Sequence, residues 1–219
     1  MLTFFATAAS VASTIGPHTL EAMVIIGAFI FGITGALAAV QKRLDFFGVI
    51  VLSIVVGLAG GTIRDVMLGI PAYVIFDWRI VVGVIASGIV GFVFHTPLLK
   101  WRNSIQYLDA LGLSLFCVLG TDISFHAHAG ALASAILGMI TGIGGGVIRD
   151  VLLNEVPRVL QRGLYAIPAL VGSTIVVIGY EVHKSNLWWY VLAGAACLVI
   201  RVLGILLDVN LPRANPQAE

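Results

Sequence analysis

Long apolar stretches separated by short polar joins run through almost the whole chain. A helix that crosses a bilayer needs about 20 mostly apolar residues. The stretches that we expect to be such helices are 22–40, 46–68, 80–99, 105–123, 129–153, 164–180 and 187–207. The joins carry Pro, Asn and Asp, which are typical of turns. The pattern predicts an all-α membrane protein with seven transmembrane helices.

The composition supports a membrane protein and excludes several other classes. Hydrophobic residues make up 59% of the chain and charged residues 11%, with a mean hydropathy of +1.06, whereas a soluble domain is about half apolar and a quarter charged. No basic stripe suggests nucleic acid. The two cysteines, Cys117 and Cys197, lie in apolar runs, where small buried side chains are common. The sequence has no motif typical of an enzyme, a metal site or a cofactor site, and we expect none of these.

Lysine and arginine in the short loops indicate the orientation in the membrane. With the N-terminus outside, the outer loops hold only Arg79 and Lys184. The cytoplasmic loops and tail then hold the other seven basic residues outside the helices: Lys42, Arg43, Lys100, Arg102, Arg158, Arg162 and Arg213. We therefore expect an external N-terminus and a cytoplasmic C-terminus.

One charged phrase occurs twice. GLAGGTIRDVML begins at Gly57, and GIGGGVIRDVLL begins at Gly142, 85 positions later, with eight of twelve positions identical. The second copy lies three helices after the first, and because three is odd, the two halves must cross the membrane in opposite directions. The sequence predicts an inverted repeat followed by a seventh helix and a disordered tail. The expected bounds are 20–99, 103–182, 186–208 and 209–219.

The glycines of this phrase have two compatible interpretations. They could kink the second and fifth helices beside a pore, where freed backbone carbonyls would face a cation. They could instead let two helices pack closely. The candidate hinges are Gly60, Gly61, Gly144, Gly145 and Gly146.

The charges of the phrase are costly in a bilayer. A charged side chain at mid-membrane costs about 2.5–3.5 kcal/mol even on the lenient insertion scale, so we expect these side chains to face the interior and find partners. Neighbours on a helix point about 100° apart, which disfavours pairing within one copy. We therefore predict crossed contacts of Arg64 with Asp150 and of Arg149 with Asp65, or contacts with freed carbonyls. The alternative is a structural clamp with no ion nearby.

Other charged residues give weaker signals. Asp109 lies about one turn into the fourth stretch, where a solvated helix-end side chain is the more common role; a pore residue is the alternative, and Asp109 is the further candidate for it. Glu21 and Asp122 lie at outer helix ends, where we expect solvated side chains. Arg201 is expected to reach the inner surface in a structural or lipid-contacting role.

The repeated three-helix unit, with GG(G)xxRD in its middle helix and a seventh helix after it, resembles the bacterial "glycine transporter" domain family, which is similar to the prokaryotic trimeric intracellular cation (TRIC) channels. The resemblance runs from about Leu20 to Asp208. It implies a homotrimer in the prokaryotic inner membrane, in contact with lipids, with one pore per subunit for potassium and also sodium. It implies pore-associated roles for Arg64, Asp65, Arg149 and Asp150, and hinges at the five glycines.

Two functions stay open on the sequence. One is a passive cation channel, in which an arginine held by Asp or carbonyls acts as a gate or a strut. The other is a carrier for a small zwitterion such as glycine, since an inverted repeat with broken helices also suits alternating access. A structural or lipid-binding membrane protein is a third alternative.

Overall fold

The computed structural model describes residues 17–101, 103–161, 164–182 and 186–209, and within these it contains only helices and loops. The tail predicted at 209–219 lies almost entirely outside the described residues. The helices, in chain order, are α2 (Pro17–Gln41), α3 (Phe46–Met67), η1 (Tyr73–Ile75), α4 (Trp78–Val93), α5 (His95–Lys100), α6 (Ser104–His126), α7 (Ala131–Leu152), α8 (Arg158–Gln161), α9 (Ala166–Glu181) and α10 (Leu187–Leu206).

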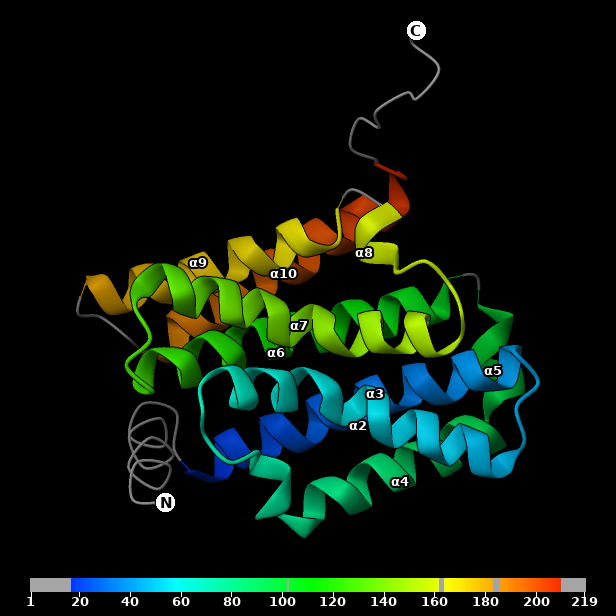
Figure 1. Cartoon of the computed structure of the whole chain (residues 1–219). Coiled ribbons are helices and arrows are strands. Elements are labelled where there is room, and N and C mark those ends of the chain that lie inside the picture. The colour runs from blue at the N-terminus through cyan, green and yellow to red at the C-terminus, as the bar shows by residue number, and fades with distance from the viewer. Residues whose placement is uncertain (1–16, 102, 162–163, 183–185, 210–219) are drawn as a thin grey trace, which may run out of the picture.

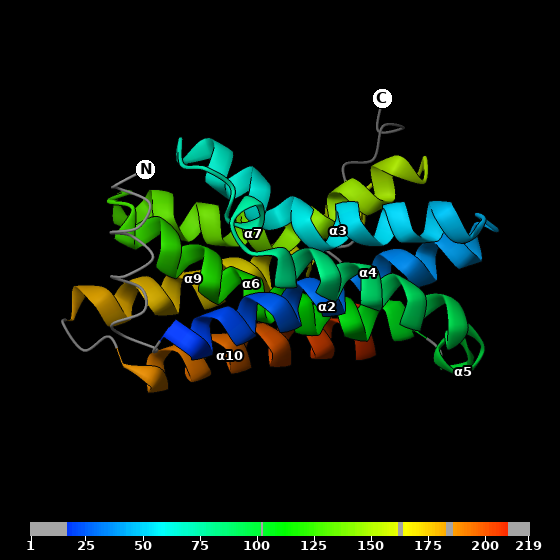
Figure 2. The ribbon, with the colours of Figure 1, turned by 90° about the horizontal axis from the view of Figure 1, so that it is seen from below.

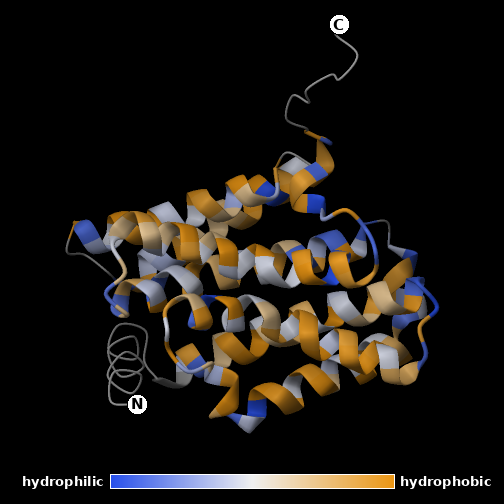
Figure 3. Cartoon of the chain, viewed as in Figure 1, coloured by the Kyte–Doolittle hydropathy of each residue, from blue (hydrophilic) through white to orange (hydrophobic). Residues whose placement is uncertain are grey.

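The prediction of an all-helical membrane protein is confirmed. Five helices, namely α2, α3, α6, α7 and α10, are long and apolar enough to cross a membrane, and α4 and α9 are apolar but shorter, at 16 residues each. The axes of the long helices are roughly aligned in both ribbon views, as in a bundle, although the chain runs along them in alternating directions (Figures 1 and 2). Apolar residues line the helices, and hydrophilic residues gather mainly at their ends (Figure 3).

The third predicted helix is shorter than expected. The apolar run 80–99 does not form one helix, because α4 ends at Val93 and the short α5 follows at His95. Pro97 lies in the first turn of α5, where its missing N–H costs no helical hydrogen bond. Hydropathy does not detect this break, since both segments are apolar.

The interior is built from two main apolar clusters. The first joins α2, α3 and α4 to one face of α6, and the second joins α6, α9 and α10. α6 is the most buried of the five long helices: 72% of an apolar stretch of 18 residues in it is buried inside the protein. Large apolar side chains point outward on the outer helices; Trp188 of α10, for example, is 77% exposed. Such faces suit contact with lipid rather than water.

Candidate functional site

Both copies of the repeated phrase end in a buried Arg-Asp pair. Arg64 and Asp65 lie in the last turn of α3 and are 6% and 2% exposed. Arg149 and Asp150 lie in the last turn of α7 and are 1% and 2% exposed. The expectation that these charges face the protein interior therefore agrees with the structure.

The backbone after each pair is the same in both copies. The N–H of Ile70 donates to the Asp65 carbonyl, and the N–H of Glu155 donates to the Asp150 carbonyl. The residue before each donor, Gly69 or Asn154, has a positive φ of 65° or 55°. This is the usual way to end a helix with its last carbonyls satisfied.

Each aspartate also holds the returning chain. Asp65 Oδ2 accepts the backbone N–H of Tyr73 at 2.9 Å, and Asp150 Oδ2 accepts that of Arg158 at 2.9 Å. Both bonds span eight residues. One carboxylate oxygen of each pair is thus committed to the loop, and the other is left for a guanidinium.

The predicted crossed pairing is wrong. Arg64 donates from Nε and Nη2 to Oδ1 of its own neighbour Asp65, at 2.8 and 2.6 Å. Arg149 likewise donates from Nε to Oδ1 of Asp150 at 3.0 Å. Figure 1 shows α3 and α7 running in opposite directions, so their C-terminal turns lie toward opposite ends of the bundle. The long arginine stem can turn back at a helix end, which the 100° argument for mid-helix neighbours did not consider.

The glycines lie where α3 crosses α7. A methyl group added at Gly60 would collide with the Thr141 carbonyl oxygen, and one at Gly145 would lie 2.6 Å from the Val56 carbonyl oxygen. One at Gly144 would lie 2.9 Å from the Gly60 Cα. Both helices are assigned as continuous through these residues, so the expected helix break is not seen. The close-packing interpretation describes the contacts present here.

The second copy is enclosed by further polar side chains. Arg149 Nη1 reaches Asp109 Oδ1 of α6 at 3.1 Å and the Thr34 hydroxyl of α2 at 3.2 Å. The buried Tyr165 ring lies nearby, since its hydroxyl would meet a methyl group added at Gly146. We call Thr34, Asp109, Arg149, Asp150 and Tyr165 the second-copy cluster.

Asp109 and Arg201 have definite places in this region. Asp109 is 1% exposed and pairs with Arg149, so it is not a solvated end residue. Arg201 is 4% exposed; it donates from Nη1 to the Leu164 carbonyl at 2.8 Å and lies 4.4 Å from the centre of the Tyr165 ring. The expected snorkelling side chain is therefore largely buried against protein.

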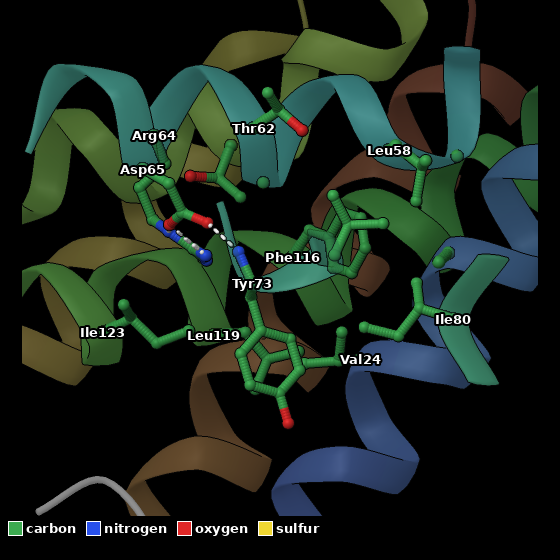
Figure 4. A pocket seen from close by; sticks show the side chains of 15 residues that line it. Val24, Leu58, Thr62, Arg64, Asp65, Tyr73, Ile80, Phe116, Leu119 and Ile123 are labelled. Atoms are coloured by element: carbon green, nitrogen blue, oxygen red, sulfur yellow. Dashed lines mark hydrogen bonds and ion pairs between the residues drawn. The ribbon is translucent and has the colours of Figure 1, made fainter. Parts of the chain in front are cut away.

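The first copy borders a small cavity instead. Arg64 and Asp65 line a space of about 60 Å³ together with mostly apolar side chains, enough for a few waters. Figure 4 shows the Arg64–Asp65 bonds and the Tyr73 N–H at one end of it and Phe116 and Ile80 further along. The walls come from α2, α3, η1, α4, α6 and α7.

Asp122 is buried, although the sequence predicted a solvated side chain at a helix end. This residue is fully buried, and its Oδ1 accepts hydrogen bonds from the hydroxyls of Tyr180 and, at 2.5 Å, Tyr190. His126 Nδ1 lies 3.6 Å from the same oxygen. The cluster ties α9 and α10 to α6. α6 continues to His126, beyond the predicted end at 123, which buries a side chain expected at a wet end.

Comparison with known proteins places the chain among bacterial membrane proteins. The family model described as "Glycine transporter" matches twice, at residues 21–96 and 106–181. The UPF0126 inner membrane protein YadS of Escherichia coli K12 is 36% identical over 86% of this chain and 92% of its own length. A UPF0126 membrane protein of Streptomyces coelicolor is 40% identical over 90% of this chain and 91% of its own.

Solved structures with the same fold are cation channels. One matching chain comes from a structure that describes conductance through TRIC cation channels. Its sequence is 32% identical to this chain, with a TM-score of 0.82, and the match covers 91% of this chain and 98% of the matching chain. The TRIC channel orthologue from Rhodobacter sphaeroides is 30% identical, with a TM-score of 0.83 over 87% and 98%. The resemblance inferred from the repeated phrase is confirmed. The similar proteins are channels and membrane proteins, and the chain is a multi-pass membrane protein rather than an enzyme.

Proposed function

The chain belongs to the glycine transporter family of membrane proteins, and from this premise we propose that it is a passive channel for monovalent cations, potassium and also sodium. The observation that carries the proposal is its likeness to TRIC cation channels at 30% identity or more over nearly its whole length. Because many functions share one fold, the proposal also names a site. That site consists of the two buried Arg-Asp pairs at the C-terminal ends of α3 and α7.

The proposed architecture is an inverted repeat, 20–99 and 103–182, followed by a seventh helix at 186–208. Local geometry supports it: the hydrogen bond that the Tyr73 N–H donates to Asp65 recurs 85 positions later as the one that the Arg158 N–H donates to Asp150. The chain directions in Figure 1 also support it, because α2 runs opposite to α6 and α3 runs opposite to α7. Two such halves meet around the middle of the bundle, where transport proteins of this kind hold their ions or substrates.

We place the pore within each subunit, along α3 and α7 and past both Arg-Asp pairs. A free arginine would repel cations, but each guanidinium here is held by at least one carboxylate within 3.0 Å. The paired charges leave polar oxygen atoms as the groups a cation would meet, among them the Thr62 and Thr141 side chains at the cavity. The glycines remain the proposed points at which α3 and α7 bend during opening.

We further propose a homotrimer in the inner membrane, with lipid against the exposed apolar faces and no bound cofactor. The proposed orientation has the N-terminus outside and the C-terminus in the cytoplasm. It puts Arg64 toward the outer side and Arg149 toward the cytoplasmic side. The Escherichia coli relative is described as an inner membrane protein, which supports the location.

The alternative is a carrier for a small amino acid such as glycine. The description of the matching family and the small cavity beside Arg64 and Asp65 favour it. In that case the arginine would hold the carboxylate and the aspartate the amine of the substrate. We favour the channel because the solved structures that match nearly the whole chain are TRIC cation channels.

Single-channel recording of the purified protein in planar bilayers under a potassium gradient tests the proposal. We expect discrete openings that reverse near the potassium potential and change in Arg64→Ala and Asp65→Asn. Arg43→Gln is the control. Arg43 is exposed and precedes the start of α3, whereas the Arg64–Asp65 pair lies at the end of that helix, so this variant should leave the openings unchanged. Silence at all voltages, together with uptake of labelled glycine by proteoliposomes, would favour the carrier instead.

A further inference from the structure

Two phenylalanines meet at the centre of the bundle, one from each half. Phe31 lies in α2 and Phe116 in α6, and their ring centres are 5.3 Å apart with a tilt of 35°. The two residues are 85 positions apart, the same spacing as the charged phrases. They are therefore counterparts in the two halves that contact each other directly.

Each ring packs against a glycine of the opposite helix. A methyl group added at Gly112 would lie 2.8 Å from the Phe31 ring, and one at Gly27 would lie 2.5 Å from the Phe116 ring. Both glycines stand four residues before a phenylalanine of their own helix, which places them on the same helix face. The sequence thus keeps room for a reciprocal aromatic pair at the point where α2 crosses α6.

The two rings differ in what surrounds them. Phe31 is fully buried, and a methyl group added at Gly145 of α7 would lie 3.3 Å from its ring. Phe116 is 6% exposed and lines the cavity that Arg64 also lines (Figure 4). Phe31 is therefore fixed between three helices, whereas Phe116 has open space beside it.

We propose that the Phe116 ring is the gate of the pore in its closed state and that Phe31 is the fixed surface against which it closes. This inference rests on the proposed channel function. A narrow constriction lined by apolar side chains blocks ions. Phe116, Leu119 and Ile80 line an apolar part of the cavity, whereas the charged side chains of Arg64 and Asp65 lie at its other end (Figure 4). Opening then requires the Phe116 ring to move away from Phe31. Either the Phe116 side chain rotates, or the helices that carry the two rings shift as α3 and α7 bend.

Recordings of Phe116→Ala and Phe116→Leu beside the wild-type protein test the gate. We expect the ratio of open to closed time to rise by about three- to tenfold in Phe116→Ala, the size of one aromatic pair contact, and by less in Phe116→Leu. Phe92→Ala is the matched control, because Phe92 also makes an aromatic pair, with Phe46 at 5.1 Å, but on the outer helix α4. It should leave the ratio unchanged.

Gly27→Ala tests the same contact from the other side. The added methyl group pushes on the Phe116 ring, so we expect altered gating in Gly27→Ala that disappears when Phe116→Ala is combined with it. Size-exclusion profiles identify variants that do not fold. If Phe116→Ala does not fold, the change in the ratio of open to closed time is measured on Phe116→Leu, which keeps an apolar side chain.

The outcomes separate the gate from the channel. A conducting wild-type protein whose gating is unchanged in folded Phe116→Ala or Phe116→Leu would overturn the gate and leave the channel standing. A wild-type protein that is silent but conducts as Phe116→Ala would support both. Silence in every variant would overturn the channel and the gate with it.

Discussion

The two copies of the repeated phrase share their sequence and their backbone but not their surroundings. Arg149 contacts Asp109 and Thr34 in addition to its neighbour. The position equivalent to Asp109 in the first half is Val24, and the position equivalent to Thr34 in the second half is Leu119; both of these apolar residues line the cavity beside Arg64.

The same contrast holds for the packing around the glycines. A methyl group at Gly146 would collide with the Tyr165 hydroxyl, whereas at the equivalent Gly61 the nearest atom is Arg64 Nη2, 3.9 Å away. Tyr165 itself corresponds to Ile80 of the first half. The repeat therefore preserves how each helix ends, and the flanking helices decide whether that end is locked. The second copy is built to be fixed, and the first has room to move.

The largest expected effect comes from removing the locked guanidinium. Arg149→Ala leaves the carboxylates of Asp109 and Asp150 buried without their cation, and breaking a buried pair in this way costs about 3–5 kcal/mol. We expect a severe loss of folded protein, measured as the free energy of unfolding in detergent or as yield on size exclusion. Arg64→Ala leaves one carboxylate beside a cavity that admits water and should cost clearly less. Equal losses in the two variants would contradict the contrast between the copies.

Much of this contrast was readable in the sequence. Hydropathy located the long apolar helices, although it missed the break between α4 and α5, and the spacing of 85 indicated which positions correspond. An alignment of the halves on that spacing places Asp109 opposite Val24, which marks the copies as unequal. The partners of the arginines were not readable, because they depend on which turn of α3 crosses α7 and on how far an arginine stem bends back. The burial of Asp122 was missed because Tyr180 and Tyr190 reach it from separate helices.

Adjacent glycines of the first copy provide a sharper test of packing. Gly60→Ala forces a methyl group against the Thr141 carbonyl, and overpacking of this kind costs about 1–3 kcal/mol. Gly61→Ala meets open space and should be neutral or stabilising by about 0.5–1 kcal/mol, because alanine favours a helix more than glycine does. Thermal unfolding in detergent compares the two. Destabilisation by Gly61→Ala alone would show that the helix crossing lies elsewhere.

The missing aspartate can be supplied to the first copy. Val24→Asp places a carboxylate at the position equivalent to Asp109, within the cavity that Arg64 lines. A hydrogen bond to a charged group contributes about 1.5–3 kcal/mol, so we expect Arg64 to be locked and the open time to fall by about tenfold. Single-channel recording measures this change. Val24→Asn, similar in size but uncharged, is the control; an equal fall in both variants would mean that polarity or shape, not the charge pair, is responsible.

The smallest effect concerns how the third helix of each half begins. Asp77 caps α4: its Oδ1 accepts the Arg79 N–H at 3.0 Å and the Arg79 Nε at 2.9 Å. Tyr165, the residue before α9, makes no capping hydrogen bond with its side chain. Asp77→Ala should destabilise the protein by about 1 kcal/mol, and Asp77→Asn, which keeps an accepting oxygen, by less. The hydrogen bond from Arg79 lowers the pKa of Asp77 below its usual value.

This shift fixes the pH dependence of the Asp77 contribution. A carboxyl group with a lowered pKa in the folded state contributes stability above its unfolded pKa and loses it as the pH falls through the folded value. The difference in unfolding free energy between wild-type protein and Asp77→Ala should therefore be constant near neutral pH and shrink below about pH 4. Unfolding curves at a series of pH values measure it. A difference that stays constant into acid would mean that Asp77 acts by shape alone, and the first half would then resemble the uncapped second half more closely than the structure indicates.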